Sequence, residues 1–419
     1  MKSSMFSSHD AVRRRLLAGM AGSGVLIATN SVRALAAQIG STEALGLAEL
    51  PDGALAEQLL YALPGKVPLI KKTYRPPNFE TPIEYFRSPI TRNDAFFVRY
   101  HLAGIPEVKV ADWKLAVGGD AAEREVSFTL ADLKKQFEPA QITAVCQCSG
   151  NRRGLFEPHV TGVEWGVGAM GNAVWRGVRL KDVLAKAGVK SSAVEIGFNG
   201  ADHPALDKTP DFVKSLPLEV AMDENTLIAF EMNGKPLPHW NGFPARLVVP
   251  GWTGTYWVKQ LVSIAALSRP ETNFWMSAAY RLPRGLFRTP SFQTQVKEAN
   301  EPITTMVVNS LVTSLRNGAK IPVGKPLDVK GIAWDGGSGV EKVEVTLDGS
   351  DWQPAKLARD LGRFSFREFS YTAPVRSRGS LTVMARATAR SGEMQVEKLV
   401  HNPAGYHHNV IQRLTMEAV

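Results

Sequence analysis

Residues 144–154 read AVCQCSGNRRG, and this stretch decides how the rest of the sequence is interpreted. The short apolar run predicts a strand, and the Ser-Gly-Asn that follows Cys148 is typical of a turn. The cysteine then stands at the end of a strand beside Arg152 and Arg153. Because neighbouring cations favour a thiolate, and thiolates bind soft metals, the pattern is compatible with a reactive or metal-binding cysteine. Taken alone, it is explained better by a buried structural cysteine beside solvated arginines.

The chain contains two cysteines, Cys146 and Cys148, separated by one residue. A disulfide between them would close a ring too small for normal geometry, so we expect no disulfide framework. At least one thiol is therefore available for another role. Strand parity puts both cysteines on one face unless a bulge separates them, and we interpret Cys146 as a packing residue.

Three further segments place cations beside apolar residues. Residues 96–101 read FFVRYH, in which Arg99 and His101 stand two apart and share one face of a strand. Residues 241–252 read NGFPARLVVPGW and lead to WVK at 257–259. Residues 274–281 read FWMSAAYR.

In order and spacing, these four segments resemble the sulfite oxidase family of molybdopterin enzymes. The resemblance covers the chain from about residue 80 to the C-terminus. It is closest to the bacterial periplasmic sulfite dehydrogenases, the molybdenum subunits of sulfite:cytochrome c oxidoreductases. It implies a molybdopterin-binding domain followed by a dimerisation domain, with one molybdenum-molybdopterin cofactor per chain.

The resemblance also implies roles for individual residues. Cys148 is expected to be the one protein ligand of molybdenum. The residues expected to bind the substrate anion or line its pocket are Arg99, His101, Arg153 and Tyr280. Those expected to hold the pterin and its phosphate are His101, Asp202, Asn241, Arg246 and Lys259. Arginine suits compact anions because its planar fork offers several charged donors. Asn241 stands where animal sulfite oxidases carry histidine, and Arg152 is interpreted as a surface or pterin-side contact.

Apolar patterning predicts an α+β fold for the middle of the chain and a β-sandwich after it. A helix at 180–187 and strands at 245–249 and 260–266 are the clearest elements of the first region. Beyond residue 297, the ranges 327–332, 340–347 and 381–387 alternate apolar and polar residues, and Asp348-Gly349 predicts a hairpin. Short alternating strands of this kind favour an immunoglobulin-like sandwich. We expect a wrapping arm at 37–85, a catalytic domain at 86–295 and the sandwich at 296–419.

The first 36 residues are expected to be an export signal. Arg13, Arg14 and Arg15 precede an apolar run too short to span a bilayer, and Ala34-Leu35-Ala36 is typical of a cleavage site. The paired arginines resemble a twin-arginine signal, although Leu16-Leu17 follows them and no Ser or Thr directly precedes them. An amphipathic N-terminal helix is the alternative. We expect a periplasmic protein cleaved near Ala36.

The net charge and the motifs together limit the possible functions. The net charge is +9, of which residues 1–36 hold +4, and no basic run follows, so an anionic ligand is favoured over nucleic acid. We expect sulfite oxidation, no haem in this chain, no membrane span, and electrons passed to cytochrome c or a cytochrome subunit. Either a homodimer or a heterodimer is expected. The alternatives are a sulfane dehydrogenase subunit acting on protein-bound sulfur, a methionine-oxide reductase, a nitrate reductase, or a non-catalytic ligand-binding module.

Overall fold

The computed structural model describes residues 60–287 and 300–419. The expected export signal, its cleavage site and the first part of the expected arm lie outside these residues. We refer to 60–287 as the N-terminal part and to 300–419 as the C-terminal part. Residues 60–85, expected to belong to the arm, form a four-stranded sheet with a strand of the next region. Its strands are β1 (Leu60–Tyr61), β2 (Leu69–Thr73), β3 (Asn78–Glu80) and β4 (Val98–Arg99).

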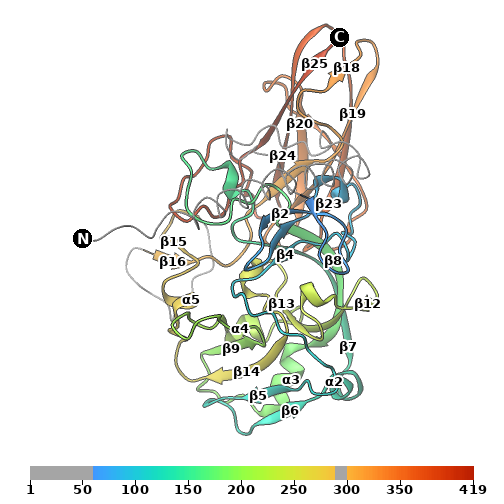
Figure 1. Cartoon of the computed structure of the whole chain (residues 1–419). Helices are drawn as coiled ribbons and strands as arrows, with labels where there is room; N and C mark the ends of the chain where they lie inside the picture. Colours follow the sequence, from blue (N-terminus) through green and yellow to red (C-terminus); the bar gives the residue numbers. More distant parts are fainter. Residues whose placement is uncertain (1–59, 288–299) are drawn as a thin grey trace, which may run out of the picture. The chain divides into compact units, whose positions relative to one another are not determined.

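Two five-stranded sheets form the body of the N-terminal part (Figure 1). The first has the order β10-β9-β14-β5-β6, in which only β14 and β5 run parallel. Its strands are β5 (Leu115–Gly118), β6 (Val126–Phe128), β9 (Glu195–Gly200), β10 (Val213–Pro217) and β14 (Leu261–Leu267). The second comprises β7 (Pro139–Gln147), β8 (Met170–Arg179), β11 (Leu227–Met232), β12 (Lys235–Pro236) and β13 (Arg246–Val248).

The helices of the described residues are short, and local sequence explains where they begin and end. In α2 (Leu130–Gln136) the Thr129 side chain accepts from the Asp132 amide, and Asp132 accepts from the Thr129 amide, which completes a capping box. The predicted helix is α3 (Leu180–Ala187), whose apolar residues face the core and which ends at Gly188 with φ 71°. The remaining helices are η2 (Ile83–Phe86), η3 (Arg153–Leu155), α4 (Leu218–Ala221), η4 (His239–Asn241), η5 (Gly254–Tyr256) and α5 (Phe274–Ser277).

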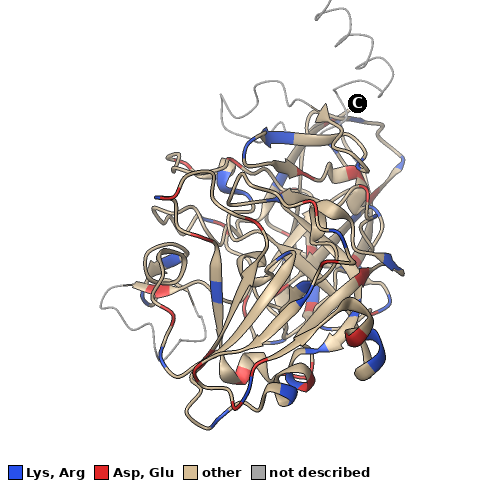
Figure 2. Ribbon diagram, turned by 60° about the horizontal axis from the view of Figure 1, so that its bottom comes forward, with Lys and Arg blue, Asp and Glu red and all other residues tan. Residues whose placement is uncertain are grey.

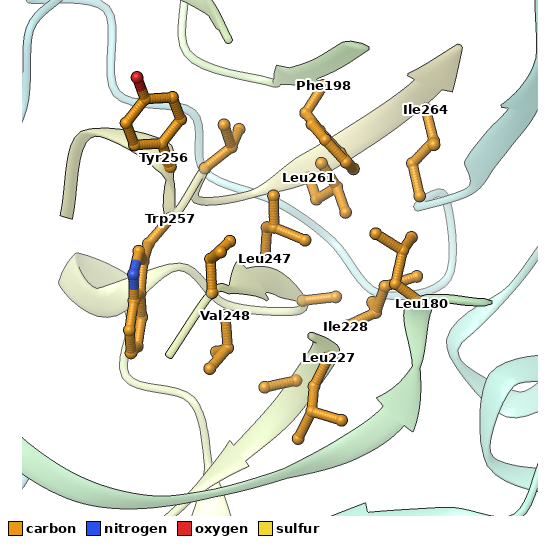
Figure 3. Close-up of a cluster of buried hydrophobic side chains, with 14 of the residues drawn as sticks. Leu180, Phe198, Leu227, Ile228, Leu247, Val248, Tyr256, Trp257, Leu261 and Ile264 are labelled. Atoms are coloured by element: carbon orange, nitrogen blue, oxygen red, sulfur yellow. The ribbon is translucent and has the colours of Figure 1, made fainter. Parts of the chain in front are cut away.

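A single apolar cluster joins these sheets and α3. In Figure 3, Leu180 of α3, Phe198 of β9 and Ile264 of β14 lie around one interior together with residues of β11 and β13. Trp257 is buried at the edge of the same group, and its indole donates to the carbonyl of Trp252. The strand that leads to the cysteines is therefore backed by a continuous core.

The C-terminal part is a two-sheet sandwich. One sheet comprises β17 (Asn309–Val312), β19 (Pro326–Trp334), β22 (Lys356–Leu357) and β23 (Arg367–Pro374). The other comprises β18 (Lys320–Ile321), β20 (Val340–Thr346), β21 (Gln353–Pro354), β24 (Gly379–Ala389) and β25 (Gln412–Ala418). Buried residues of both sheets share one apolar cluster. The predicted hairpin is present, since β20 pairs with β21 across Asp348 and Gly349.

The end of β7 is fixed by contacts with the C-terminal part. The Val145 amide donates to the Phe364 carbonyl at 2.9 Å, and the Trp334 indole donates to Gln147 Oε1 at 2.7 Å. On its other side, β7 pairs with β8, where Cys146 faces Gly171. A Cβ at Gly171 would lie 2.4 Å from the Phe96 ring, so only glycine fits there. The cysteine segment is thus held from both sides.

A two-stranded sheet of β15 (Arg281–Pro283) and β16 (Asn300–Pro302) joins the two parts. In Figure 2 the basic and acidic segments alternate along the ribbon instead of gathering on one element. Among the described residues, no helix has the length and apolarity needed to cross a bilayer.

Candidate active site

A pocket opens where β7 ends. Cys148 follows the last residue of β7, and Cys148 and Cys146 both line the pocket and are both buried thiols. The pocket also gathers nearly every predicted site residue. The predicted residues that line it are Arg99, His101, Cys148, Asp202, Asn241, Arg246, Lys259 and Tyr280. Among the predicted residues, only Arg153 is not part of the lining.

The turn after β7 holds Cys148 through its backbone. The Cys148 amide donates to the Ala169 carbonyl at 2.9 Å, and its carbonyl accepts from the Asn151 amide at 2.9 Å. The Asn151 side chain closes the turn, because its Oδ1 accepts from the Ala169 amide at 3.0 Å. Ser149 also lines the pocket, and its buried hydroxyl has no hydrogen-bond partner among the described atoms. The thiol is therefore preorganised, beside a hydroxyl that is available to a ligand.

Arg99 reaches the pocket from β4. Its Nη1 donates to Asn78 Oδ1 at 3.1 Å and to the Tyr100 carbonyl. Its Nε is buried and has no partner among the described atoms. Leaving a charged donor unsatisfied in a buried site is costly, so this nitrogen is available for an anion.

His101 and Tyr280 are hydrogen-bonded to each other between His101 Nε2 and the Tyr280 hydroxyl. Burial and then the charges of Arg99, Lys259 and Lys214 hold the pKa of His101 well below its usual value, so the imidazole is neutral. Its ring stacks on Phe212 with the centroids 3.8 Å apart. Burial raises the pKa of Tyr280, and its hydroxyl therefore keeps its proton. The pair is a neutral hydrogen-bonding group within a cationic pocket.

Arg246 occupies the far wall of the pocket between two indoles. Its guanidinium carbon lies 5.0 Å from the Trp175 ring centre and 5.6 Å from that of Trp257. It donates to the carbonyls of Asn241 at 3.0 Å and Trp257 at 3.1 Å, while its buried Nε has no partner among the described atoms. Arg246 Nη2 also lies 3.8 Å from Cys146 Sγ. Burial raises the pKa of Cys146, so this cysteine remains a thiol.

Lys259, Asp202 and Asn241 complete the wall. Lys259 donates to the Arg99 carbonyl at 2.8 Å, and burial lowers its pKa to about 8. Burial raises the pKa of Asp202, an effect that the charge of Lys259 partly opposes. Asn241 Oδ1 accepts from Lys66 Nζ at 2.5 Å, and its Nδ2 donates to the Phe97 carbonyl at 3.0 Å. Asn241 is thus held in place by the surrounding chain.

The charges in this pocket suit an anionic ligand. Three cationic side chains, Arg99, Arg246 and Lys259, line the pocket with a single carboxylate, Asp202. Two of these cations keep a buried donor without a partner among the described atoms. Buried charges are stable when they are paired and hydrogen-bonded, so an anionic ligand would complete the site. Within residues 60–287 and 300–419, no group of three or more His, Cys, Asp and Glu side chains could hold a metal.

The two arginines that follow the cysteine segment point elsewhere. Arg152 is buried and donates to the carbonyls of Ser310 at 2.7 Å and Val410 at 3.1 Å, both in the C-terminal part. Its interpretation as a surface contact is therefore wrong, because the guanidinium is buried and backbone carbonyls of the C-terminal part accept from it. A pterin-side contact stays a prediction. Arg153 donates to the carbonyls of Ala404 at 3.0 Å and Val163 at 3.2 Å. It lies behind the pocket lining.

Two residues near the site were not predicted from the sequence. Lys214 is buried, donates to the Trp275 carbonyl at 2.7 Å and lies 5.2 Å from the Tyr280 ring centre. Tyr406 of the C-terminal part stacks on Tyr280. Neither belongs to a motif, and both approach the site only through tertiary packing. Ser149, by contrast, could have been inferred from its place beside Cys148.

The chain matches two family models in succession. The oxidoreductase molybdopterin binding domain matches residues 101–275, and the Mo-co oxidoreductase dimerisation domain matches residues 300–418. The sulfite oxidase of Gallus gallus is 33% identical over 342 residues, which cover 78% of this chain and 72% of that protein. The mitochondrial sulfite oxidase of Homo sapiens is 35% identical over 326 residues, which cover 74% and 58%. The chain thus spans little more than half the length of the mammalian relatives it matches.

A solved structure agrees in fold. The sulfane dehydrogenase SoxCD of Paracoccus pantotrophus superposes with a TM-score of 0.71 at 26% identity, covering 87% of this chain and 90% of that one. Fold and site define a molybdopterin-binding oxidoreductase with a C-terminal dimerisation domain. More closely, the chain belongs to the sulfite oxidase family. The predicted family, fold class and molybdopterin cofactor are confirmed, whereas the domain boundaries and the roles of individual site residues stay predictions.

Proposed function

We propose that this chain oxidises sulfite to sulfate and passes the electrons to a separate acceptor. The observation that carries the proposal is the convergence of Arg99, His101 and Tyr280 with Cys148 in one buried cationic pocket. Such a pocket binds a compact oxyanion through charged donors and excludes bulk water. The similarity to sulfite oxidases supports sulfite as that anion.

We propose that Arg99, His101 and Tyr280 bind and orient the substrate. Arg99 Nε would donate to a sulfite oxygen, because it is buried and has no hydrogen-bond partner among the described atoms. Tyr280 would donate its hydroxyl proton, which its raised pKa retains, and neutral His101 would hold that hydroxyl in place. Arg153 would act from behind the lining through its charge. Orientation of this kind aligns the sulfur lone pair for reaction.

The cofactor would be held by residues of the same pocket. We propose that the Cys148 thiolate is its protein ligand, and that Arg246 and Lys259 bind the phosphate. Asp202, Asn241 and His101 would contact the pterin. When bound, the molybdenum cofactor supplies the two-electron oxidant for conversion of sulfite and water to sulfate and two protons. One cofactor per chain is expected.

The proposed electron acceptor is a c-type cytochrome, either free or as a dedicated subunit. The sequence has no Cys-x-x-Cys-His segment for haem attachment. Redox encounters of this type use small polar interfaces with electrostatic steering. Cytochrome reduction should therefore depend on ionic strength more strongly than chemistry at the buried pocket does. The dimerisation domain supports assembly as a homodimer or heterodimer.

We also propose export to the periplasm, which rests on residues 1–36 alone. Arg14-Arg15 would direct the folded, cofactor-loaded protein to the twin-arginine route, and cleavage near Ala36 would follow. N-terminal sequencing of the mature protein should begin near Ala37. Changing both arginines to lysine should leave unprocessed precursor in the cytoplasm. A mature chain that starts at Met1 would refute the signal.

A second candidate is a sulfane dehydrogenase subunit acting on protein-bound sulfur. The structural match that covers 87% of this chain favours it, because the matching structure is that of a sulfane dehydrogenase. The four-residue neighbourhood of Arg99, His101, Tyr280 and Cys148 would serve either substrate. The two candidates differ in whether the substrate is a free anion or is carried by another protein.

Turnover of free sulfite tests the proposal. Purified protein should contain about one molybdenum per chain, show no Soret band and reduce ferricytochrome c when sulfite is added. Reduction only with a protein-bound sulfane would favour the second candidate. Oxygen uptake that matches sulfite consumption without any cytochrome would make the protein an oxidase. Absence of molybdenum in protein made with ample cofactor supply would favour a non-catalytic binding module.

A further inference from the structure

A loop of the C-terminal part reaches the wall of the pocket. Tyr406, which lies between β24 and β25, stacks on Tyr280 with the ring centroids 5.6 Å apart and the planes 18° from parallel. The Arg153 guanidinium carbon lies 5.1 Å from the centre of the same Tyr406 ring. One side chain therefore contacts two of the residues proposed to act on the substrate.

The chain holds Tyr406 firmly in this position. Asn402 Oδ1 accepts from the Tyr406 amide at 3.0 Å, and Asn402 Nδ2 donates to the Tyr406 carbonyl at 2.9 Å. Between them, Gly405 has φ 63°, and a Cβ there would lie 2.7 Å from Arg153 Cγ. Asn309 donates to the His408 carbonyl at 2.8 Å, which ties the loop to β17. These contacts together hold the Tyr406 ring against Tyr280 at the pocket wall.

Tyr280 needs such support. Its φ is 58°, a left-handed conformation that is strained for a residue with a large side chain. Strained residues persist where the surroundings determine them from several sides. The Tyr280 carbonyl accepts from the Ile303 amide at 2.9 Å, its hydroxyl is bonded to His101, and Lys214 lies over its ring. Stacking by Tyr406 adds a further constraint on the ring.

We propose that Tyr406 is a positioning residue, supplied by the C-terminal part, that holds the Tyr280 ring at the anion pocket and the Arg153 guanidinium behind it. The inference rests on the proposed function, because it concerns the pocket proposed to bind sulfite. The ring carries the effect, since both contacts are made by the ring, and no described atom is hydrogen-bonded to the Tyr406 hydroxyl. The anion pocket is therefore incomplete without the C-terminal part.

Substitutions at Tyr406 in the cofactor-loaded protein test this role. Tyr406→Leu keeps an apolar side chain but removes the ring, and should lower kcat/KM for sulfite by about tenfold, in line with the loss of one aromatic and one cation–π contact. Tyr406→Phe keeps both contacts and should stay within about twofold of the parent protein. Tyr371→Leu is the matched control, because it removes a half-buried ring from β23 of the same part. It should lower thermal stability and leave kcat/KM unchanged.

A double substitution separates positioning from general destabilisation. In a Tyr280→Leu background, Tyr406→Leu should cost little more, because the ring it positions is gone. Asn402→Ala leaves the ring but frees the loop, and should lower kcat/KM by about threefold. Equal losses in Tyr406→Phe and Tyr406→Leu, or full additivity with Tyr280→Leu, would overturn the proposal.

Sulfate binding provides a reading that does not depend on turnover. Sulfate should raise the unfolding temperature of the parent protein and of Tyr406→Phe, and should do so much less for Tyr406→Leu. A parent protein that binds sulfate but does not oxidise sulfite would contradict the proposed function alone. Tyr406→Leu with the full sulfate-induced shift and unchanged kcat/KM would contradict the role of Tyr406.

Discussion

Two pairs of arginines around Cys148 differ in whether they line the pocket. Arg99 and Arg246 come from distant strands, line the pocket and each keep a buried Nε without a partner among the described atoms. Arg152 and Arg153 follow the cysteine directly, yet they donate to carbonyls of residues 310, 410, 404 and 163. Adjacency to the cysteine in sequence is therefore a poor guide to which cations line the pocket.

The difference has an energetic consequence for each region. At the junction with the C-terminal part, backbone carbonyls accept from the guanidinium groups, so these arginines stabilise the fold without a ligand. In the pocket, unsatisfied cations destabilise the chain until an anion binds. Binding of the cofactor should therefore raise the stability of the whole chain. The substitutions below test this contrast.

The largest effect is expected at the cysteines. Cys148→Ser should abolish turnover, by about a thousandfold or more, because an alcohol does not replace a thiolate as a soft ligand. Cys146→Ser should retain most activity, since burial keeps Cys146 protonated beside Arg246. Steady-state sulfite turnover and molybdenum content of both variants provide the measurement. If both variants remained active, the ligand would have to be another group.

The next effect contrasts the arginine pairs directly. Arg99→Gln should lower kcat/KM by roughly 2–4 kcal/mol, through loss of a charged donor to the anion, and should leave thermal stability nearly unchanged. Arg152→Gln should do the reverse: it should cost about 3 kcal/mol of unfolding free energy, because two buried carbonyls lose a charged partner, and leave turnover per folded molecule intact. Kinetics and denaturant unfolding of the same preparations measure both. Equal kinetic losses in the two variants would erase the contrast.

Replacing Arg153 should produce both effects, a kinetic loss and a loss of stability. Because two of its guanidinium nitrogens donate to carbonyls while its charge is close to Tyr406 and Tyr280, Arg153→Gln should lower kcat/KM and stability together. We expect roughly 2 kcal/mol in kcat/KM, at the low end for an oxyanion donor. Arg153→Lys should recover the charge but not the two-pronged geometry, so the loss should be only partly reversed. Unchanged kinetics in Arg153→Gln would confine this residue to the junction.

Tyr280→Phe should have a smaller effect. It removes the hydroxyl bonded to His101 but keeps the ring that Tyr406 contacts, so kcat/KM should fall by about tenfold. Molybdenum content should not change, because Tyr280 is proposed to contact substrate. Metal analysis alongside kinetics decides between these roles. Loss of the metal in this variant would indicate a structural role for the hydroxyl.

The smallest predicted effect is a pH dependence of stability that arises from two buried histidines of the C-terminal part. Burial lowers the pKa of His407 to about 4 and that of His408 to about 3, so both are neutral when folded. The unfolded chain takes up these protons below about pH 6.5, and stability is therefore present above that pH and lost as the pH falls towards 4. Each histidine contributes at most about 1.4 kcal/mol per pH unit over this range.

The variant His407→Asn tests the origin of that slope. Asparagine tolerates the positive φ of 56° at this position and does not titrate, so the loss of stability on acidification should become shallower. His159→Asn is the control. His159 is exposed, and its replacement should leave the slope unchanged. Denaturant unfolding at several pH values between 4 and 7 measures it. An identical slope in His407→Asn would assign the effect to other groups.

Local patterns predicted those elements whose formation depends on neighbours in sequence. The helix α3 coincides with the predicted range 180–187, because its apolar spacing and terminal Gly188 are local signals. Alternation of apolar and polar residues likewise located β19, β20 and β24 to within a few residues. The region 37–85, in contrast, showed no clean period, and its described residues form the short strands β1, β2 and β3, of which β3 pairs with β4. Pairing between distant short strands leaves no periodic signal.

For the site, the sequence alone determined which residue types are present and which motifs carry them. The segment around Cys148, the Arg99–His101 pair and the run to Tyr280 were sufficient to identify the family and its cofactor. Only the tertiary structure decided which cations reach the pocket, because that depends on which elements pack around the end of β7. Arg152 and Arg246 are the same residue type and both are buried, yet Arg152 donates to carbonyls of the C-terminal part and Arg246 lines the pocket. The position of Tyr406 also depends on tertiary structure, since its ring meets Tyr280 only after the two parts of the chain have packed together.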